Sequence, residues 1–156
     1  MKSIDDGSFE FPGNIPCADI ELFLEKPDVQ MAQNELPPAS QTMALANVQK
    51  ALRTLTRSGS NPTKETFIVT CDSSMDRSRA RRGVLPCLTC RAEGPWVTSR
   101  GRRLRLEEMM RLQGMDPSEF KVVVTKAKLG AQIGNAMSVN VMERIFCESS
   151  SGCRIS

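Results

Sequence analysis

The amino-acid sequence predicts an α+β fold in which a small mixed region of short strands and loops is followed by a long C-terminal helix. Three stretches of the 156-residue chain carry this prediction. Apolar residues at three- and four-residue spacing predict an amphipathic helix over about 43–56. Residues 66–71 form a short run rich in β-branched side chains, which is typical of a strand. Apolar residues recur at helical spacing over about 128–148, which predicts one long helix.

Four shorter elements are expected around these three. Asp19 is a favourable N-cap for a short helix, and Gly114 is a favourable C-cap for another. Two strand candidates lie between them, and the first is expected at a sheet edge because Pro86 has no N–H to donate. The four elements cover residues 19–25, 84–89, 96–98 and 106–113.

Composition and charge divide the chain into four segments. An irregular acidic segment is expected over 1–42, a mixed region over 43–126, the C-terminal helix over 127–148 and a tail over 149–156. The first 45 residues carry eight acids and two bases, whereas the remainder carries ten acids and nineteen bases. A basic C-terminal two-thirds is typical of a phosphate-facing surface, although a solvated charged face gives the same balance.

The composition also limits the class of protein. The chain has no histidine, which excludes mechanisms that need an imidazole base. No apolar run approaches the roughly 20 residues that span a membrane, and the N-terminus lacks an apolar signal core. We therefore expect a nuclear or cytoplasmic protein, not a secreted one, with reduced cysteines. Cys87 and Cys90 form the only C-x-x-C pair, so no metal site is expected.

Two short motifs stand in the last third of the chain. Residues 102–114 read R-R-L-R-L-E-E-M-M-R-L-Q-G, and residues 132–137 read Q-I-G-N-A-M. Their order and spacing resemble the end of the DNA (cytosine-5)-methyltransferase family, where an R-x-L-T-x-R-E-x-x-R-L-Q-G helix precedes a terminal Q-I-G-N-A/S-V segment. Arg105 stands at the family's Thr position and Met137 at its Val position. The resemblance is most specific over 84–147.

The resemblance implies a partial S-adenosylmethionine-dependent methyltransferase fold. Residues 43–126 would be a target-recognition region, and the helix over 127–148 would dock on a catalytic domain. The R-L-Q-G helix is mainly architectural in the family. The three residues of the second motif that would line the S-adenosylmethionine pocket, together with the large domain, are Asn135, Ala136 and Met137.

Two arginine clusters flank the predicted strands at 84–89 and 96–98. Arginine suits bidentate contacts to phosphate and to guanine. Thr89 matches the second Thr of a P-T-[IL]-T strand that precedes the helix motif in many family members. We therefore expect contacts with duplex DNA rather than a merely solvated surface. The residues expected to make these contacts are Arg79, Arg81, Arg82, Thr89, Arg100 and Arg102.

The residues that perform the family's chemistry are missing from the chain. In the family, the Cys of a Pro-Cys-Gln loop attacks cytosine C6, and the Glu of Glu-Asn-Val assists at N3. Neither tripeptide occurs here, since the two Pro-Cys pairs are followed by Ala18 and Leu88. We therefore expect no catalytic residue and interpret the chain as a C-terminal fragment, inactive until it is joined to a separate catalytic half. The alternatives are a non-catalytic DNA-binding or regulatory module derived from the family, and an unrelated α+β domain with chance motifs.

Overall fold

The computed structural model describes residues 13, 16, 18–27, 36–89 and 93–150, and it confirms the α+β class. The helices are α1 (Thr42–Arg57), α2 (Leu106–Leu112), α3 (Lys126–Asn135) and α4 (Val139–Ser150). The strands are β1 (Phe67–Val69), β2 (Ala80–Arg82), β3 (Trp96–Val97) and β4 (Arg102–Arg103). The short 3-10 helices are η1 (Ile20–Leu22), η2 (Thr98–Arg100) and η3 (Pro117–Glu119). In these ranges, no helix is long and apolar enough to cross a membrane.

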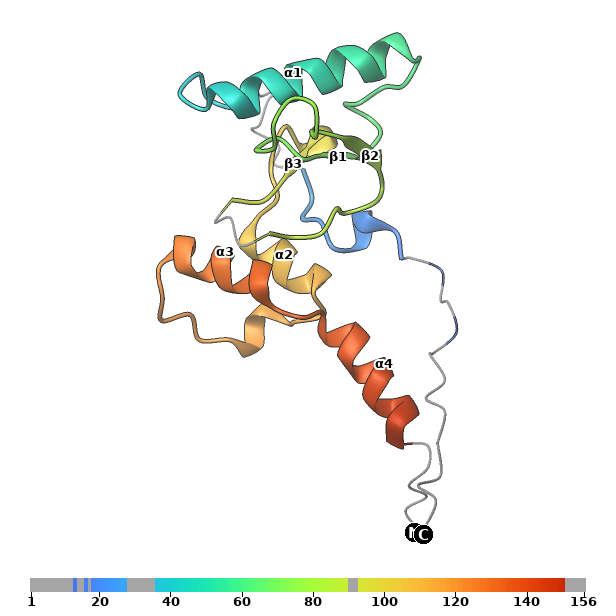
Figure 1. The fold of residues 1–156 in the computed structure, drawn as a ribbon, viewed down its shortest axis with the longest axis vertical. Helices are drawn as coiled ribbons and strands as arrows, with labels where there is room; N and C mark the ends of the chain where they lie inside the picture. The colour runs from blue at the N-terminus through green and yellow to red at the C-terminus, as the bar shows by residue number, and fades with distance from the viewer. Residues whose placement is uncertain (1–12, 14–15, 17, 28–35, 90–92, 151–156) are drawn as a thin grey trace, which may run out of the picture.

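The described elements form three layers (Figure 1). α1 lies on one side of a four-stranded antiparallel sheet with the order β2-β1-β3-β4, and α2 and α3 lie on the other side. Because successive strand side chains point to opposite faces, β1 serves both cores. Ile68 packs toward α2 and α3, while Val69 packs beneath α1. α4 extends away from the three layers (Figure 1).

α1 confirms the helix predicted over 43–56 and packs on the sheet through one face. The core between α1 and the sheet consists of Ala44, Val48, Val69, Cys71 and Trp96. Asn47 is also buried on this face, and its side-chain amide donates to the carbonyl oxygens of Cys71 and Ser73, both at 2.7 Å. These bonds fix the helix to the chain that leaves β1, so the opposite face of α1 is left to solvent.

The larger core lies between the sheet and the pair α2 and α3. It consists of Ile20, Leu24, Ile68, Val97, Leu104, Met109, Met110 and Ile133. Met109 and Met110 are nearly fully buried, as expected for the inward face of α2. Since the members of this core come from both ends of the described chain, burial of apolar surface holds the motif-bearing helices to the sheet.

Residues 18–27, here called the N-terminal strap, run between the sheet and α2 (Figure 1). Asp19 acts as the predicted N-cap, since its carboxylate accepts the N–H of Glu21 at 3.0 Å. Only the three residues of η1 become helical, however, and the predicted short helix through Glu25 does not form. The N–H of Glu25 donates instead to the Glu108 carboxylate at 2.8 Å, which holds the strap against α2.

The prediction of one long C-terminal helix over about 128–148 is wrong. α3 ends at Asn135, the backbone is extended at Ala136 (ψ 148°), and α4 begins at Val139. In a continuous helix, the N–H of Val139 would donate to the carbonyl of Asn135. It donates instead to the carbonyl oxygen of Gln113 at 2.8 Å, so a contact with the end of α2 sets the break.

The strand predicted over 84–89 is also wrong, since these described residues form no strand. The sheet takes β2 (Ala80–Arg82) as its edge strand instead. Gly83 ends β2 with a left-handed backbone at φ 61°, and its N–H donates to the Thr66 carbonyl. Pro86 lacks the N–H that a continued ladder would need. The strands predicted over 66–71 and 96–98 are confirmed as β1 and β3.

Candidate functional site

The two sequence motifs are in direct contact. The side-chain amide of Gln113 donates to the carbonyl oxygen of Ile133 at 3.2 Å. The main-chain carbonyl oxygen of Gln113 accepts the N–H of Val139 at 2.8 Å. One residue of the first motif therefore bonds on both sides of the break between α3 and α4. This contact positions residues 134–138, which include the residues expected to face the cofactor.

Gly114 ends α2, as predicted, and its position requires a glycine. Its φ of 81° lies in the left-handed region, which side chains rarely adopt. A Cβ atom at this position would lie 2.4 Å from Oδ1 of Asn140, near the start of α4. A side chain at this position would therefore meet the end of the Asn140 side chain, in addition to the strain of its left-handed backbone.

The three expected cofactor residues do not gather around one cavity. Ala136 is half-buried and, with Gly134 and Ser138, lines a cavity of about 550 Å³. Asn135 and Met137 are exposed and do not line it, and Met137 is 66 % exposed. The exposed carboxamide of Asn135 offers both donors and an acceptor. The structure therefore brings only one of the three expected residues, Ala136, to this cavity.

A buried carboxylate organises the start of α2. Glu108 is fully buried and accepts two hydrogen bonds from the Arg102 guanidinium, at 2.7 and 2.9 Å. It also accepts the backbone N–H groups of Arg105, at 2.7 Å, and of Glu25, at 2.8 Å. Burial alone raises the pKa of Glu108, but these donors outweigh it and lower the pKa below its usual value. The charged carboxylate thus joins α2, β4 and the strap.

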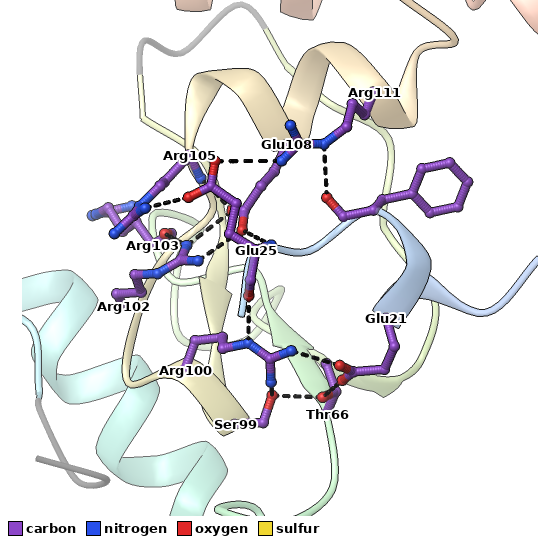
Figure 2. Close-up of polar contacts among 11 residues, drawn as sticks. Glu21, Glu25, Thr66, Ser99, Arg100, Arg102, Arg103, Arg105, Glu108 and Arg111 are labelled. Atoms are coloured by element: carbon purple, nitrogen blue, oxygen red, sulfur yellow. Dashed lines mark hydrogen bonds and ion pairs between the residues drawn. The ribbon is translucent and has the colours of Figure 1, made fainter. Parts of the chain in front are cut away.

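Three further arginines hold the strap in place (Figure 2). Arg100 donates to the carbonyl oxygen of Glu25 at 3.0 Å and pairs with the carboxylate of Glu21 at 2.6 Å. Arg105 pairs with the Glu25 carboxylate. Arg111 donates to a strap carbonyl at 3.1 Å and lies 3.5 Å from the Glu25 carboxylate. We call this network the arginine clamp, and its members are Glu21, Glu25, Arg100, Arg102, Arg105, Glu108 and Arg111.

The six residues expected to contact DNA fall into two groups. Arg100 and Arg102 belong to the clamp, and the side chain of each is only 10 % exposed. Their hydrogen bonds are directed at protein groups, so their placement differs from the exposed arginines that the sequence suggested. The other four residues are exposed on the surface, and they are Arg79, Arg81, Arg82 and Thr89.

Three of the exposed residues form what we call the basic edge, which consists of Arg79, Arg81 and Arg82. Arg81 and Arg82 stand on β2, one of the two edge strands of the sheet. The Arg82 side chain is 72 % exposed, and its ion pair with Glu65 is 3.2 Å long. Arg79 donates to carbonyl groups of its own loop. Thr89 does not stand on β2 and lines a cavity of about 260 Å³.

Arg103 stands on β4, the edge strand opposite β2, and anchors the loop that follows β1. Its guanidinium makes two hydrogen bonds to Asp72, both at 2.8 Å, and its Nε lies 2.9 Å from Glu93 as an ion pair without hydrogen-bond geometry. It also donates to the sulfur of Cys71 at 3.2 Å. Burial raises the pKa of the Cys71 thiol to about 11. This thiol is therefore protonated at neutral pH and is a poor nucleophile.

Sequence reasoning missed two features. Glu108 stands three residues after Arg105, the N-cap of α2, and this is the spacing of a capping box. The spacing of Lys50, Arg53 and Arg57 places three cations on one face of α1. Both signals are present in the sequence, but only the structure shows what each side chain faces.

Comparison with known protein families gives one match. The family model of C-5 cytosine-specific DNA methylases matches residues 24–150, which is more than half of the chain. The matched region includes both motifs, α1 and the basic edge. No curated protein and no solved structure matches the chain.

Proposed function

Because the chain belongs to the C-5 cytosine-specific DNA methylase family, we propose that it serves an enzyme that transfers a methyl group from S-adenosylmethionine to C5 of cytosine in duplex DNA. In this proposal, the chain supplies the target-recognition surface and one wall of the cofactor site. The observation that carries the proposal is the contact through Gln113 between the two family motifs. This contact joins the recognition region and the cofactor-facing segment.

The basic edge is the proposed DNA-contacting surface. Its arginines are exposed and stand on or beside an edge strand, where their guanidinium groups are accessible to a duplex. Arginine donors match phosphate oxygens and the O6 and N7 atoms of guanine. Thr89 is a further proposed phosphate contact. Arg100 and Arg102 instead hold the strap and α2, and so act on DNA only by keeping the recognition region folded.

The break between α3 and α4 is the proposed cofactor-facing segment. When bound, S-adenosylmethionine supplies the methyl group that is transferred. Asn135, Ala136 and Met137 would hold it from one side, with the Asn135 carboxamide as the polar contact and Met137 as the apolar one. Gln113 keeps these residues in place through its two hydrogen bonds.

The remaining chemistry is assigned to a separate catalytic half. Attack on cytosine C6 needs a thiolate, and the family's Pro-Cys-Gln and Glu-Asn-Val tripeptides do not occur in this sequence. Cys71 is buried with a raised pKa, and Cys87, although exposed, stands in Pro-Cys-Leu. The chain alone is therefore proposed to bind duplex DNA without methylating it.

Two assays with the purified 156-residue chain test this proposal. Fluorescence anisotropy with labelled duplex DNA at low salt should show binding that weakens as salt rises. Incubation with DNA and S-adenosylmethionine carrying a labelled methyl group should leave the DNA unlabelled. Labelled DNA would contradict the assignment of catalysis to another half. Absence of binding at low salt would contradict the assignment of DNA recognition.

A further inference from the structure

α1 carries a basic ridge on the face opposite its core contacts. The ridge consists of Lys50, Arg53 and Arg57, all of them exposed. Spacings of three and four residues place these side chains in a line along the helix. Ala44 and Val48 on the opposite face are buried against the sheet. At about 1.5 Å per residue, the ridge spans roughly 10 Å of the helix axis.

The ridge lies in a stretch of the sequence that contains no acidic residue. Residues 36–64 contain four cations, namely the ridge and Lys64, and no Asp or Glu. Among the described residues, Arg53 and Arg57 take part in no ion pair. Lys50 donates to the main-chain carbonyl oxygen of Met75 at 3.1 Å. The ridge therefore presents a concentrated positive potential to solvent.

One end of the ridge lies beside the loop that leads into the basic edge. The bond from Lys50 to the Met75 carbonyl oxygen joins the ridge to this loop, which carries the exposed Arg77 and continues into β2. Near the other end, Lys64, Arg82 and Arg100 line a cavity of about 610 Å³, but Asp19, Glu21 and Glu65 line it as well, so the cavity itself is not basic. The link between the ridge and the edge therefore rests on the Lys50 bond.

We propose that the basic ridge binds the phosphate backbone of duplex DNA beside the segment that the basic edge contacts. This inference rests on the proposed DNA recognition and extends its surface to a helix outside both motifs. Helices that bind membranes insert a free apolar face, whereas the apolar face of α1 is packed on the sheet. Single-stranded nucleic acid is typically held by exposed aromatic side chains, and the sequence over 36–64, which includes α1, contains no Phe, Tyr or Trp beside the ridge cations.

A triple substitution tests the ridge: Lys50→Gln, Arg53→Gln and Arg57→Gln in the full chain. Glutamine keeps a high helix propensity, so circular dichroism should show unchanged helix content. Binding of duplex DNA is measured by anisotropy across a salt series. Removal of three phosphate contacts should lower the slope of log K against log salt by about 2.7. The matched control replaces three exposed lysines outside the ridge and edge, namely Lys121→Gln, Lys126→Gln and Lys128→Gln, and should lower the slope by less than about 1.

A third variant separates this inference from the proposed function. Its substitutions, Arg79→Gln, Arg81→Gln and Arg82→Gln, remove the basic edge. If the edge variant binds DNA more weakly while the ridge variant keeps the wild-type slope, the ridge inference is overturned and DNA recognition stands. If only the ridge variant loses slope, the ridge is supported and the assignment of recognition to the edge is overturned. If the unmodified chain binds no duplex at low salt, or binds anionic vesicles equally well, both assignments fail.

Discussion

The arginine clamp and the basic edge use the same side chain in opposite environments. In the clamp, the side chains of Arg100 and Arg102 are only 10 % exposed, and each meets a carboxylate within 2.7 Å. At the edge, the Arg82 side chain is 72 % exposed, and its carboxylate partner lies 3.2 Å away. Arg81 is also exposed on the same strand.

The positions of acidic residues, not the density of arginines, separate the structural arginines of the clamp from the edge arginines that are free to bind a ligand. A buried guanidinium must meet a carboxylate, because desolvation of an unpaired charge is costly. Glu21 and Glu25 of the strap and Glu108 of α2 supply that charge to the clamp. An exposed pair contributes little, so the edge arginines remain free to exchange a protein partner for phosphate.

The largest expected effect comes from Glu108→Gln. The substitution keeps the shape of the side chain but leaves the Arg102 guanidinium buried without its counter-charge. Loss of one partner of a buried ion pair costs about 3–5 kcal/mol, so the free energy of unfolding in urea should fall by that amount. The control is Glu107→Gln at an exposed neighbouring position, with an expected loss below about 1 kcal/mol. Equal losses for the two variants would show that the clamp is not a stabilising buried pair.

Lowering the pH should remove the stability that the Glu108 carboxylate contributes. The pKa of Glu108 is lowered in the folded state, so its contribution to stability is complete above the unfolded pKa of about 4.3. That contribution is lost as the pH falls through the lower, folded pKa. Unfolding curves at several pH values should therefore show a constant difference between wild type and Glu108→Gln above about pH 5, and a shrinking difference below about pH 4. A difference that persists at acid pH would argue against a charged Glu108 in the folded protein.

An intermediate effect is expected at Gly114, where the end of α2 meets the Asn140 side chain of α4. Gly114→Ala adds a Cβ atom at a left-handed position and against Asn140, and it should cost about 1–2 kcal/mol by chemical denaturation. Gly59 has a similar φ of 83° but no atom within 4 Å of its Cβ position, so Gly59→Ala should cost only about 1 kcal/mol. The comparison isolates the steric part of the effect. Equal costs would mean that the Asn140 side chain turns away from the added methyl group and contributes no steric cost.

The smallest effect on stability is expected at the basic edge. Arg82→Gln removes an exposed ion pair and should change the free energy of unfolding by less than about 1 kcal/mol. Thermal unfolding of Arg82→Gln beside Glu65→Gln gives the check, since both variants break the same pair. A loss as large as that of Glu108→Gln would place the edge arginine in a structural role and remove the contrast with the clamp.

Local sequence patterns were sufficient to predict the elements whose structure depends on residues close by in the chain. The apolar spacing in α1, the β-branched run of β1 and the glycine that ends α2 all act over a few residues. The break before Val139 depends instead on a bond to Gln113, which is distant in sequence. Because the helical period continues across the break, periodicity alone predicts one helix.

The candidate site also contains some features that local sequence predicts and others that depend on distant residues. Exposure of Arg79 and Arg81 was expected from their polar surroundings. The burial of Arg102 could not be predicted, because it depends on a buried carboxylate partner, Glu108. Glu108 in turn accepts the N–H of Glu25, which lies 83 positions earlier in the sequence. The second motif gives the position of Asn135 and Met137, but the outward direction of their side chains follows from where α3 ends.

The most direct test of the contrast between clamp and edge is the salt dependence of duplex binding by the Arg79→Gln, Arg81→Gln and Arg82→Gln variant, measured beside its thermal midpoint. The slope of log K against log salt should be lower than that of the wild type by about 2.7, with a nearly unchanged midpoint. An unchanged slope with a clearly lowered midpoint would contradict the proposed contrast, because the edge would then stabilise the fold and would not contact DNA.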